Sequence, residues 1–332
     1  MGDNIINKKN ARRVNYLRVS VTDRCNLRCI YCSPVRNFKF FPHKEILTFE
    51  EIVRLVRIGL MLGIEKVRLT GGEPFVRRDF LKLLELLLNT FPGLDLRITT
   101  NGTLLTKDTI LRLKKIGIKA INVSLDTFDR KKFFKITGKD LHHRVINAIY
   151  DLIDSEIMTK INVVALRDIN QDEVLKFAKF AYENPVHVRF IEFMDLSMSK
   201  HQMDIYFYSA DDILSTIKKE YALIRYEPKE SAKGPARMYK IQGGLGKIGI
   251  ISPISNHFCH TCNRFRITAN GRLKTCLFAE KAYDLKPILR NPKLGDRFLY
   301  RIMKNAVAKK PIGSELISKQ GNGIQGMYVV GG

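Results

Sequence analysis

The chain lacks any long apolar run. Its most apolar segment, residues 81–88, contains Lys82 and Glu85 and is too short to cross a bilayer. The N-terminus has no apolar core of the kind that a secretory signal carries, and position six is Ile where a myristoylation motif has Ser or Thr. We therefore expect a cytoplasmic protein without a membrane partner.

Acidic residues are scarce relative to basic ones: 33 Asp and Glu face 57 Lys and Arg, a formal net charge of +24. Such an excess attracts polyanions, including nucleic acid, a nucleoside triphosphate or an acidic surface. The basic residues are spread along the chain without a long block, so a solvated Lys-rich surface also explains the excess. Charge alone does not predict nucleic-acid binding, and we expect no nucleic-acid partner.

Cysteine is limited to six residues, which form two triplets and leave none over. The first is C-x3-C-x2-C and the second is C-x2-C-x13-C: Cys25, Cys29 and Cys32, then Cys259, Cys262 and Cys276. Disulfide frameworks are typical of short secreted chains, whereas this chain is long enough to bury a core. We therefore favour metal binding. An iron-sulfur cubane takes four ligands, so three thiolates leave one iron open to a small molecule.

Short β-branched or apolar runs predict strands in the first two thirds of the chain, with helical periodicity between them. The strands are predicted at residues 16–21, 66–70, 95–100, 120–125, 160–165 and 187–193. The helices are predicted at residues 49–62, 78–89, 107–116, 144–154 and 172–182. This α/β alternation predicts parallel strands joined by right-handed crossovers, in a doubly wound sheet or in a closed or partial barrel.

Unusual residues follow or end each predicted strand. They are Cys25, then 71–74, 99–102, 124–126, Asn162 and 192–194. Catalytic groups in barrels gather at the carboxyl ends of several strands, so this clustering favours a barrel or a barrel segment.

The pattern changes after residue 203. A helix is predicted at 211–221, a turn at Gly243-Gly244, an apolar run at 248–251 and a helix at 299–309. We therefore expect a first domain at residues 1–203 and a smaller second domain at 204–332. Composition alone predicts a flexible end for the Gly-rich tail at 321–332.

The first triplet, with Tyr31 before its last cysteine and with Gly71-Gly72-Glu73-Pro74 after a strand, resembles radical S-adenosylmethionine (SAM) enzymes. The second triplet narrows the resemblance to the GTP 3',8-cyclase family, which carries out the first step of molybdenum cofactor biosynthesis. The similar segments run in order along nearly the whole chain: 21–25, 68–74, 99–102, 122–126, 189–194, the second triplet with Arg264 and Arg266, and Gly331-Gly332.

The resemblance implies a partial (β/α)6 TIM-like barrel of the radical SAM type, with a smaller C-terminal domain. It implies one [4Fe-4S] cluster on each triplet, with SAM at the first and guanine at the second. The expected reaction is lyase chemistry, in which a 5'-deoxyadenosyl radical from SAM abstracts hydrogen from C3' of GTP and the carbon radical adds to C8. The implied partners are GTP, an electron donor and a downstream cyclic pyranopterin monophosphate synthase. A homodimer is compatible with the sequence, which does not give the oligomeric state.

The resemblance also implies residues for the SAM pocket, namely Tyr31, Gly72, Glu73, Ser124 and Met194. Gly72 permits close backbone approach, and the Glu73 carboxylate can meet the amino group of SAM. For Glu73 the alternative is a carboxylate at a helix N-terminus, and for Met194 it is an ordinary core position.

A further set matches the GTP-binding positions of the family: Arg18, Arg68, Thr99, Lys160, Arg264 and Arg266. Arginine suits a triphosphate because its planar fork pairs bidentately with phosphate oxygens. Arg18 and Arg68 lie within predicted strands and Lys160 begins one, so their burial would require an anionic partner. Gly331 and Gly332 correspond to the tail of the family, which reaches into the active site, and we expect a catalytic role for them.

Alternatives remain for both triplets and for the function. A zinc knuckle with a distant fourth ligand is the alternative for the first triplet, and zinc completed by His257 or His260 is the alternative for the second, where spacing alone does not decide. The functional alternatives are a peptide-modifying radical SAM enzyme with an auxiliary cluster and a zinc-stabilised nucleic-acid-binding protein. The chain also departs from many relatives at Ser33 and in the bulky residues 328–330 before the tail glycines.

Overall fold

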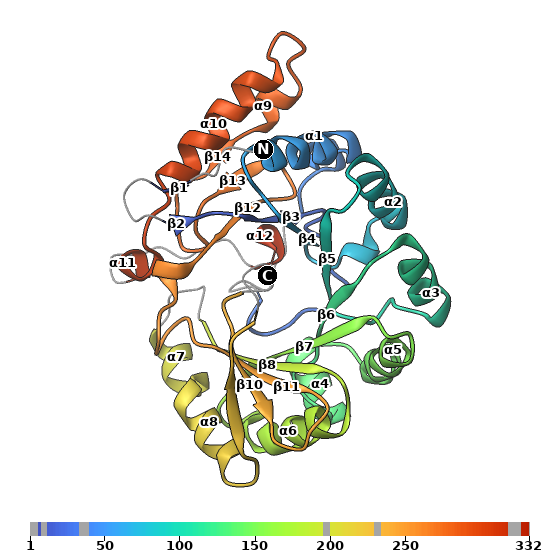
Figure 1. Ribbon diagram of the computed structural model, residues 1–332, viewed down its shortest axis with the longest axis vertical. Helices are drawn as coiled ribbons and strands as arrows, with labels where there is room; N and C mark the ends of the chain where they lie inside the picture. Colours follow the sequence, from blue (N-terminus) through green and yellow to red (C-terminus); the bar gives the residue numbers. More distant parts are fainter. Residues whose placement is uncertain are drawn as a thin grey trace. The chain divides into compact units, whose positions relative to one another are not determined.

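The computed structural model describes residues 6–7, 12–32, 40–194, 200–228, 234–317 and 327–331 (Figure 1). The chain forms two compact units. The first unit contains residues 1–26, 32–98 and 259–332, and the second contains 27–31 and 99–258. No helix within the described ranges has the length and apolarity needed to cross a membrane.

The strands of the first unit lie in the order β14-β13-β12-β3-β4-β5. Pairing is parallel from β12 to β5, whereas β13 and β14 are antiparallel to their neighbours. The bounds are β3 (Tyr16–Ser20), β4 (Lys66–Thr70), β5 (Asp95–Thr100), β12 (Arg264–Ile267), β13 (Arg272–Lys274) and β14 (Tyr283–Asp284). A separate antiparallel pair joins β1 (Ile6–Asn7) to β2 (Arg12–Arg13). The parallel pairing of β12 with β3 brings the segment after Cys262 beside the strand that leads to Cys25.

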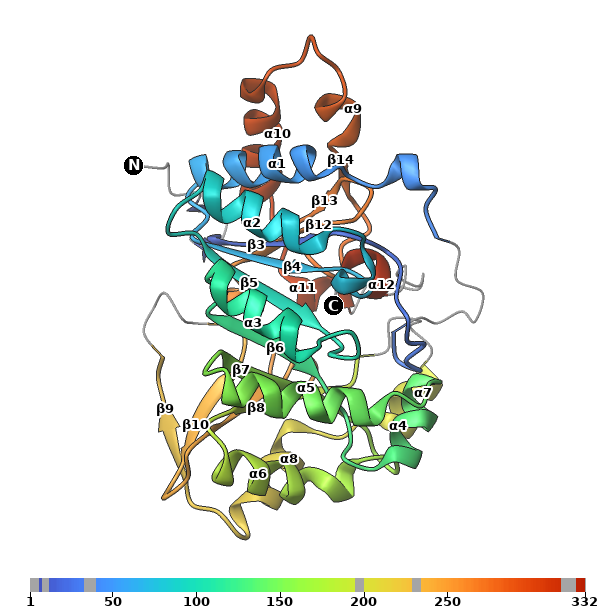
Figure 2. The same ribbon diagram turned by 90° about the vertical axis from the view of Figure 1, so that its right-hand side faces the viewer.

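The helices of the first unit are α1 (Phe49–Met61), α2 (Phe80–Thr90), α9 (Lys286–Leu289), α10 (Asp296–Ala308), α11 (Gly313–Ile317) and α12 (Met327–Val330). Thr48 and Glu51 form a capping box that starts α1. At Gly59 of α1, a Cβ atom would lie 3.4 Å from Leu17, so this helix packs on the Leu17 face of β3. Since side chains alternate along a strand, Arg18 lies on the opposite face. Figures 1 and 2 show α1 and α2 on one side of β3 and β4, and α12 on the other.

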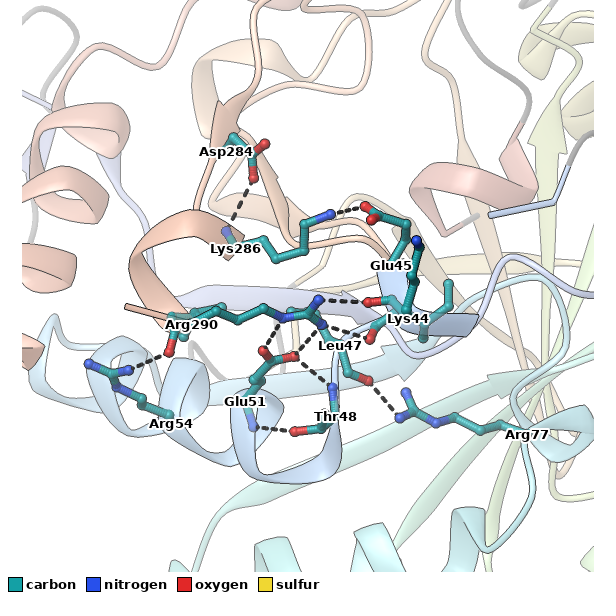
Figure 3. A network of polar contacts seen from close by, with 12 residues as sticks. Lys44, Glu45, Leu47, Thr48, Glu51, Arg54, Arg77, Asp284, Lys286 and Arg290 are labelled. Carbon is teal, nitrogen blue, oxygen red and sulfur yellow. Dashed lines mark hydrogen bonds and ion pairs between the residues drawn. The ribbon is translucent and has the colours of Figure 1, made fainter. Parts of the chain in front are cut away.

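Polar contacts hold the C-terminal part of the first unit against α1 (Figure 3). The Arg290 guanidinium donates to the Glu51 carboxylate at 2.7 Å and to the Lys44 carbonyl at 2.6 Å. The Arg54 guanidinium donates to the Leu289 carbonyl at 3.0 Å and pairs with Asp296 at 2.6 Å. Residues after Cys259 are therefore an integral part of the unit that carries β3 and β4.

The strands of the second unit lie in the order β6-β7-β8-β11-β10-β9. The pairs from β6 to β11 are parallel, and β10 pairs antiparallel with both β11 and β9. The bounds are β6 (Ala120–Ser124), β7 (Met158–Ala165), β8 (His187–Glu192), β9 (Leu223–Tyr226), β10 (Arg237–Ile241) and β11 (Lys247–Ile251).

The helices of the second unit are α3 (Lys107–Ile116), α4 (Arg130–Thr137), α5 (His142–Asp154), α6 (Val174–Glu183), α7 (Lys200–Tyr206) and α8 (Ala210–Lys218). Helix α5 packs on β7, while α6 packs on β8 and β11 and α8 packs on β8 (Figure 2). Buried apolar residues of these helices cover one face of the strands, which leaves the other face to polar side chains.

The predicted α/β architecture is confirmed. The predicted ranges 66–70, 95–100 and 107–116 match β4, β5 and α3 as observed, and the other predicted elements differ from the observed ones by a few residues at their ends. Helices α4, α7, α9, α11 and α12 and strands β1, β2, β9, β10, β12, β13 and β14 were not predicted. The α4 sequence is short and half of it is charged, so its periodicity is weak; Asp129 at its N-cap and Gly138 at its C-cap set its bounds.

Candidate functional site

The first unit brings two thiols of the second triplet, those of Cys259 and Cys276, close to the backbone of Gly313. Cys259 lies in a short 3-10 helix, Cys262 precedes β12 and Cys276 follows β13; all three are half-buried. A Cβ atom on Gly313 would lie 2.9 Å from Cys276 Sγ and 3.4 Å from Cys259 Sγ. A side chain at position 313 would crowd both thiols, and three soft thiolates suit an iron-sulfur cluster.

Positive charge surrounds Cys262. Burial raises the pKa of its thiol, but attraction to Arg264 and Lys310, together with hydrogen bonds from Arg264, outweighs burial and lowers the pKa to about 6. The thiolate is the form that binds metal. Arg264, which the resemblance assigns to GTP, therefore lies beside the second triplet.

No three His, Cys, Asp or Glu side chains among the described residues lie close enough to hold a single metal ion. His260, one of the two possible zinc ligands, is exposed. The thiolates of a cubane bind different irons and do not converge on one ion, so the same finding leaves a cluster site open.

The cysteines of the first triplet are all half-buried, with Cys25 and Cys32 in the first unit and Cys29 in the second. The segment before Cys25 is held by the turn after β4. Gly72 N–H donates to the Thr22 carbonyl and Glu73 N–H donates to the Arg24 carbonyl, both at 2.8 Å. A Cβ atom on Gly72 would lie 2.2 Å from the Arg24 carbonyl oxygen, so this approach requires glycine.

Three further residues predicted for the SAM pocket are Glu73, Ser124 and Met194. Glu73 is buried, and its carboxylate accepts a hydrogen bond of 3.1 Å from Phe75 N–H, which is the capping role considered as the alternative. Ser124 is half-buried at the end of β6, in register with Asn162 of β7. Met194 is half-buried just after β8. Their contacts with SAM remain predictions.

Tyr31, between Cys29 and Cys32 in sequence, is held by the end of β6. Its hydroxyl donates to Asp126 Oδ2 at 2.6 Å, and Val164 N–H donates to Asp126 Oδ1 at 2.8 Å. Burial raises the pKa of Asp126 to about 6, although both hydrogen bonds oppose this shift. The Tyr31 ring packs on an apolar cluster of the second unit: Ile136, Leu166, Ile169 and Phe193.

A row of basic residues crosses the first unit on the face away from α1. Strand register places these residues side by side: Lys274, Arg266, Arg18, Arg68 and Arg97. Arg68 and Arg266 are buried, and Arg18 is half-buried. The Arg68 guanidinium donates to the Ile98 carbonyl at 2.9 Å and also to the Tyr16 hydroxyl. This cation row joins three of the predicted GTP residues.

Crowding and burial both act against the charges of the cation row. Burial and then repulsion from Arg266 hold the pKa of Arg18 well below its usual range. Burial and then Arg264 lower the pKa of Arg266 to about 10, and burial with Arg97 lowers that of Lys66 to about 8. A bound polyanion would offset these costs.

The second unit carries a similar polar face. Lys160 is buried in β7, and register places Asn122, His187 and Lys247 in line with it. Burial, with Arg189, Lys160 and Lys247, lowers the pKa of His187 to about 3. The side-chain oxygens of Asn122 and Asn162 are buried and accept no hydrogen bond from the described part of the chain. This face offers acceptors and cations to a polar ligand. The remaining predicted GTP residue, Thr99, is half-buried in β5.

Sequence reasoning missed several residues of these two faces: Tyr16, Lys66, Arg97, Asn122, His187, Arg189, Lys247 and Lys274. All of them except Lys247 lie two residues from another polar or basic residue, on strands whose intervening residues are mostly apolar. That alternation is visible in the sequence, and it would have identified the polar face once strand register was known.

The C-terminal tail enters the same face of the first unit as the cation row. Gly331 is buried with φ +72°, and its carbonyl accepts a hydrogen bond of 2.6 Å from Arg266. A Cβ atom on Gly331 would lie 2.5 Å from Thr70 Cγ2. The flexible end predicted from composition is therefore not observed at Gly331, and Gly332 lies outside the described residues.

Comparison with known proteins accounts for both halves of the chain. Residues 19–181 match the model of the Radical SAM superfamily, and residues 186–316 match the model named Molybdenum Cofactor Synthesis C. A GTP 3',8-cyclase of Desulforamulus reducens is 40% identical over 301 residues, which cover 90% of this chain and 92% of that protein. A GTP 3',8-cyclase of Syntrophomonas wolfei is 40% identical over 334 residues and covers 98% of this chain and 99% of its own.

A similar fold is found in a crystal structure of Streptococcus suis SuiB bound to S-adenosylmethionine. The TM-score is 0.62 at 16% identity, over 94% of this chain and 70% of that chain. At this identity the likeness concerns the fold alone.

Proposed function

Because this chain belongs to the GTP 3',8-cyclase family of radical SAM enzymes, we propose that it converts GTP to (8S)-3',8-cyclo-7,8-dihydroguanosine 5'-triphosphate, the first step of molybdenum cofactor biosynthesis. The observation that carries the proposal is the in-register cation row, in which Arg68 and Arg266 are buried and into which the C-terminal Gly331 also extends. A bound triphosphate would offset the burial and mutual repulsion of these charges.

Each triplet would hold one [4Fe-4S] cluster. Cys25, Cys29 and Cys32 would bind the cluster that meets SAM, and Cys259, Cys262 and Cys276 would bind the second; the thiol donors and the glycine at 313 fit such groups. Together the first cluster and SAM supply the one-electron chemistry that generates the 5'-deoxyadenosyl radical. The protein positions the reactants: Tyr31, Gly72, Glu73, Ser124 and Met194 would line the SAM pocket.

Arg18, Arg68 and Arg266 would hold the triphosphate, with Thr99, Lys160 and Arg264 as further GTP contacts. Fixed guanidinium groups pair with phosphate oxygens without reorganising when the substrate binds. Gly331 and Gly332 would reach the reacting nucleotide through backbone groups, because they carry no side chains.

The basic residues around Tyr16 lead to a pH-dependent affinity for GTP. Burial opposes ionisation of the Tyr16 phenol, but Arg68, Arg18 and Lys66 outweigh burial and lower its pKa to about 7. A bound polyanion would raise this pKa and that of Lys66, so binding takes up protons. The affinity for GTP should be highest below pH 7. As the pH rises above the pKa that Tyr16 or Lys66 has in the free protein, each group should lower the affinity by up to about tenfold per pH unit.

Calorimetry of GTP binding at pH 6.5–9, in buffers of different ionisation enthalpy, measures this proton uptake. Tyr16→Phe is the control, and it should lose the part of the proton uptake that begins near pH 7. GTP itself titrates equally in both experiments, so the difference between parent and variant reports Tyr16 alone. An affinity that stays constant or rises with pH would contradict the charge arrangement.

The proposal also covers the domain division, the cellular location and the partners of the enzyme. We assign the barrel and first cluster to residues 1–203 and the second cluster to 204–332, and we place the enzyme in the cytoplasm. An electron donor would reduce the first cluster, and a cyclic pyranopterin monophosphate synthase would receive the product. A homodimer is the oligomeric state to test first.

The proposed function is tested by anaerobic reconstitution. The protein should then carry about eight irons per chain, in two cubanes. With GTP, SAM and dithionite it should form the 3',8-cyclised nucleotide together with 5'-deoxyadenosine, as measured by chromatography and mass spectrometry.

Two outcomes would overturn the assignment. Zinc without iron in the anaerobically purified protein would remove the radical chemistry and would favour a zinc-stabilised protein. Iron at both sites with SAM cleavage, but with modification of a peptide and no reaction of GTP, would favour a peptide-modifying radical SAM enzyme.

A further inference from the structure

Two buried cations near the second triplet have no role in holding SAM or GTP in the proposal above. Arg12 is 5% exposed and Lys310 is 3% exposed, and both lie in the first unit. A buried lysine or arginine is costly unless its donors are satisfied, so the partners of these two residues indicate what they stabilise.

The Lys310 ammonium joins the segments of two cysteines. It donates to the Arg264 carbonyl at 2.7 Å, two residues after Cys262, and to the carbonyl of Thr275, which directly precedes Cys276. It also lies near enough to Cys262 and Cys276 for their charges to interact with its own. One side chain therefore connects the start of β12 with the end of β13 beside both thiols.

The Arg12 guanidinium joins the segment of the third cysteine to Lys310. Its Nη1 donates to the Cys259 carbonyl at 2.6 Å, and its Nη2 donates to the carbonyls of Lys310 and Pro311 at 2.8 and 3.1 Å. Every cysteine segment of the triplet is thus tied, directly or through Lys310, to a buried cation.

We propose that Lys310, supported by Arg12, is a positioning residue of the second cluster: it holds the three cysteine segments at the spacing that a cubane requires and places positive charge beside their thiolates. This inference rests on the proposed function, since it takes an iron-sulfur cluster as the occupant of the triplet. A cluster with three thiolate ligands carries net negative charge, which a buried ammonium offsets without acting as a ligand.

The test uses the full chain in which Cys25, Cys29 and Cys32 are replaced by serine, so that only the second cluster forms. In this background Lys310→Met removes the ammonium and keeps the length of the side chain. Lys309→Met is the matched control, because Lys309 is the adjacent lysine and is exposed. After anaerobic reconstitution, iron and sulfide are measured, the reduced protein is examined by electron paramagnetic resonance, and iron release to a chelator is timed.

The parent and Lys309→Met should retain about four irons per chain. Lys310→Met should retain less than half as much iron and should release it at least tenfold faster, whereas Lys310→Arg should recover most of the iron with an altered resonance spectrum. With the first triplet restored, Lys310→Met should still form 5'-deoxyadenosine at the parental rate, which shows that the protein is folded.

Lys310→Met with parental iron content, release rate and spectrum would overturn the proposal. If Lys310→Met also lost the first cluster in the protein with both triplets, the proposal would be overturned, because the effect would then be on folding in general. Arg12→Gln, measured in the same way, should also lower the iron content of the second triplet. If the triplet held zinc instead of a cluster, the parent itself would carry no iron there. If the substrate were a peptide instead of GTP, the parent would still carry about four irons and the test of Lys310 would be unaffected.

Discussion

Replacing Cys259, Cys262 and Cys276 by serine should abolish formation of the cyclic nucleotide while the protein continues to cleave SAM. The proposed SAM site draws its cluster ligands from the other triplet, so its chemistry does not need these thiols. The second triplet lies beside β12, which carries Arg264 and Arg266 next to Arg18 of β3. A cluster there can hold the base of a nucleotide whose phosphates meet the cation row, and its loss should leave the radical without a positioned target.

The measurement is single-turnover formation of 5'-deoxyadenosine and of cyclic nucleotide, with GTP deuterated at C3'. In the variant, 5'-deoxyadenosine should form without deuterium. The matching replacement of Cys25, Cys29 and Cys32 should abolish both products. Cyclisation by the variant at the parental rate would show that the second triplet does not serve the substrate.

Gly331→Ala should lower cyclic product formation about 100-fold, a cost typical of a small misplacement in an active site. The new methyl group would lie 2.5 Å from Thr70 Cγ2, and an alanine would be strained at φ +72°. The tail must then leave its place, and the Gly331 carbonyl loses the guanidinium of Arg266. Both clusters, the melting temperature and SAM cleavage should change little, because the substitution alters none of the six cysteines.

The control is Gly93→Ala. Gly93 has a comparable φ of +84°, but a Cβ atom there meets nothing within 4 Å, so this variant carries the backbone strain without the clash. Deleting Gly331 and Gly332 together should have at least the effect of Gly331→Ala. If the truncated protein turns over GTP at the parental rate, the tail has no part in catalysis.

Several strands of the fold were predictable because apolar residues alternate with polar ones along them. Strand β4 is bounded by charged and glycine-rich segments, and its predicted range equals the observed one. Strand β12 was missed although Arg264-Phe265-Arg266-Ile267 alternates, because four residues beside a cysteine motif are too few to establish a period. Its pairing with β3 is a long-range contact that periodicity does not contain.

The residues of the candidate site were likewise only partly predictable from the sequence. Arg18 and Arg68 were selected because they match GTP-binding positions of the family, and their place within predicted strands supported the selection. Lys310 could not, since Lys309-Lys310 at the end of α10 has the appearance of a solvated pair, and only the structure separates an exposed lysine from a buried one. The resemblance connects the tail with the site, and that role stays a prediction; composition alone predicts a flexible end, which is not observed at Gly331.

The cation row also has a consequence for turnover. The proposed reaction changes the ribose and the base and leaves the triphosphate as it was. Arg266, Arg18 and Arg68 would therefore bind substrate and product alike, which contributes affinity without lowering the barrier of the chemical step. Product inhibition should be strong, and departure of the product, rather than cyclisation, should limit the steady-state rate unless a following enzyme removes it.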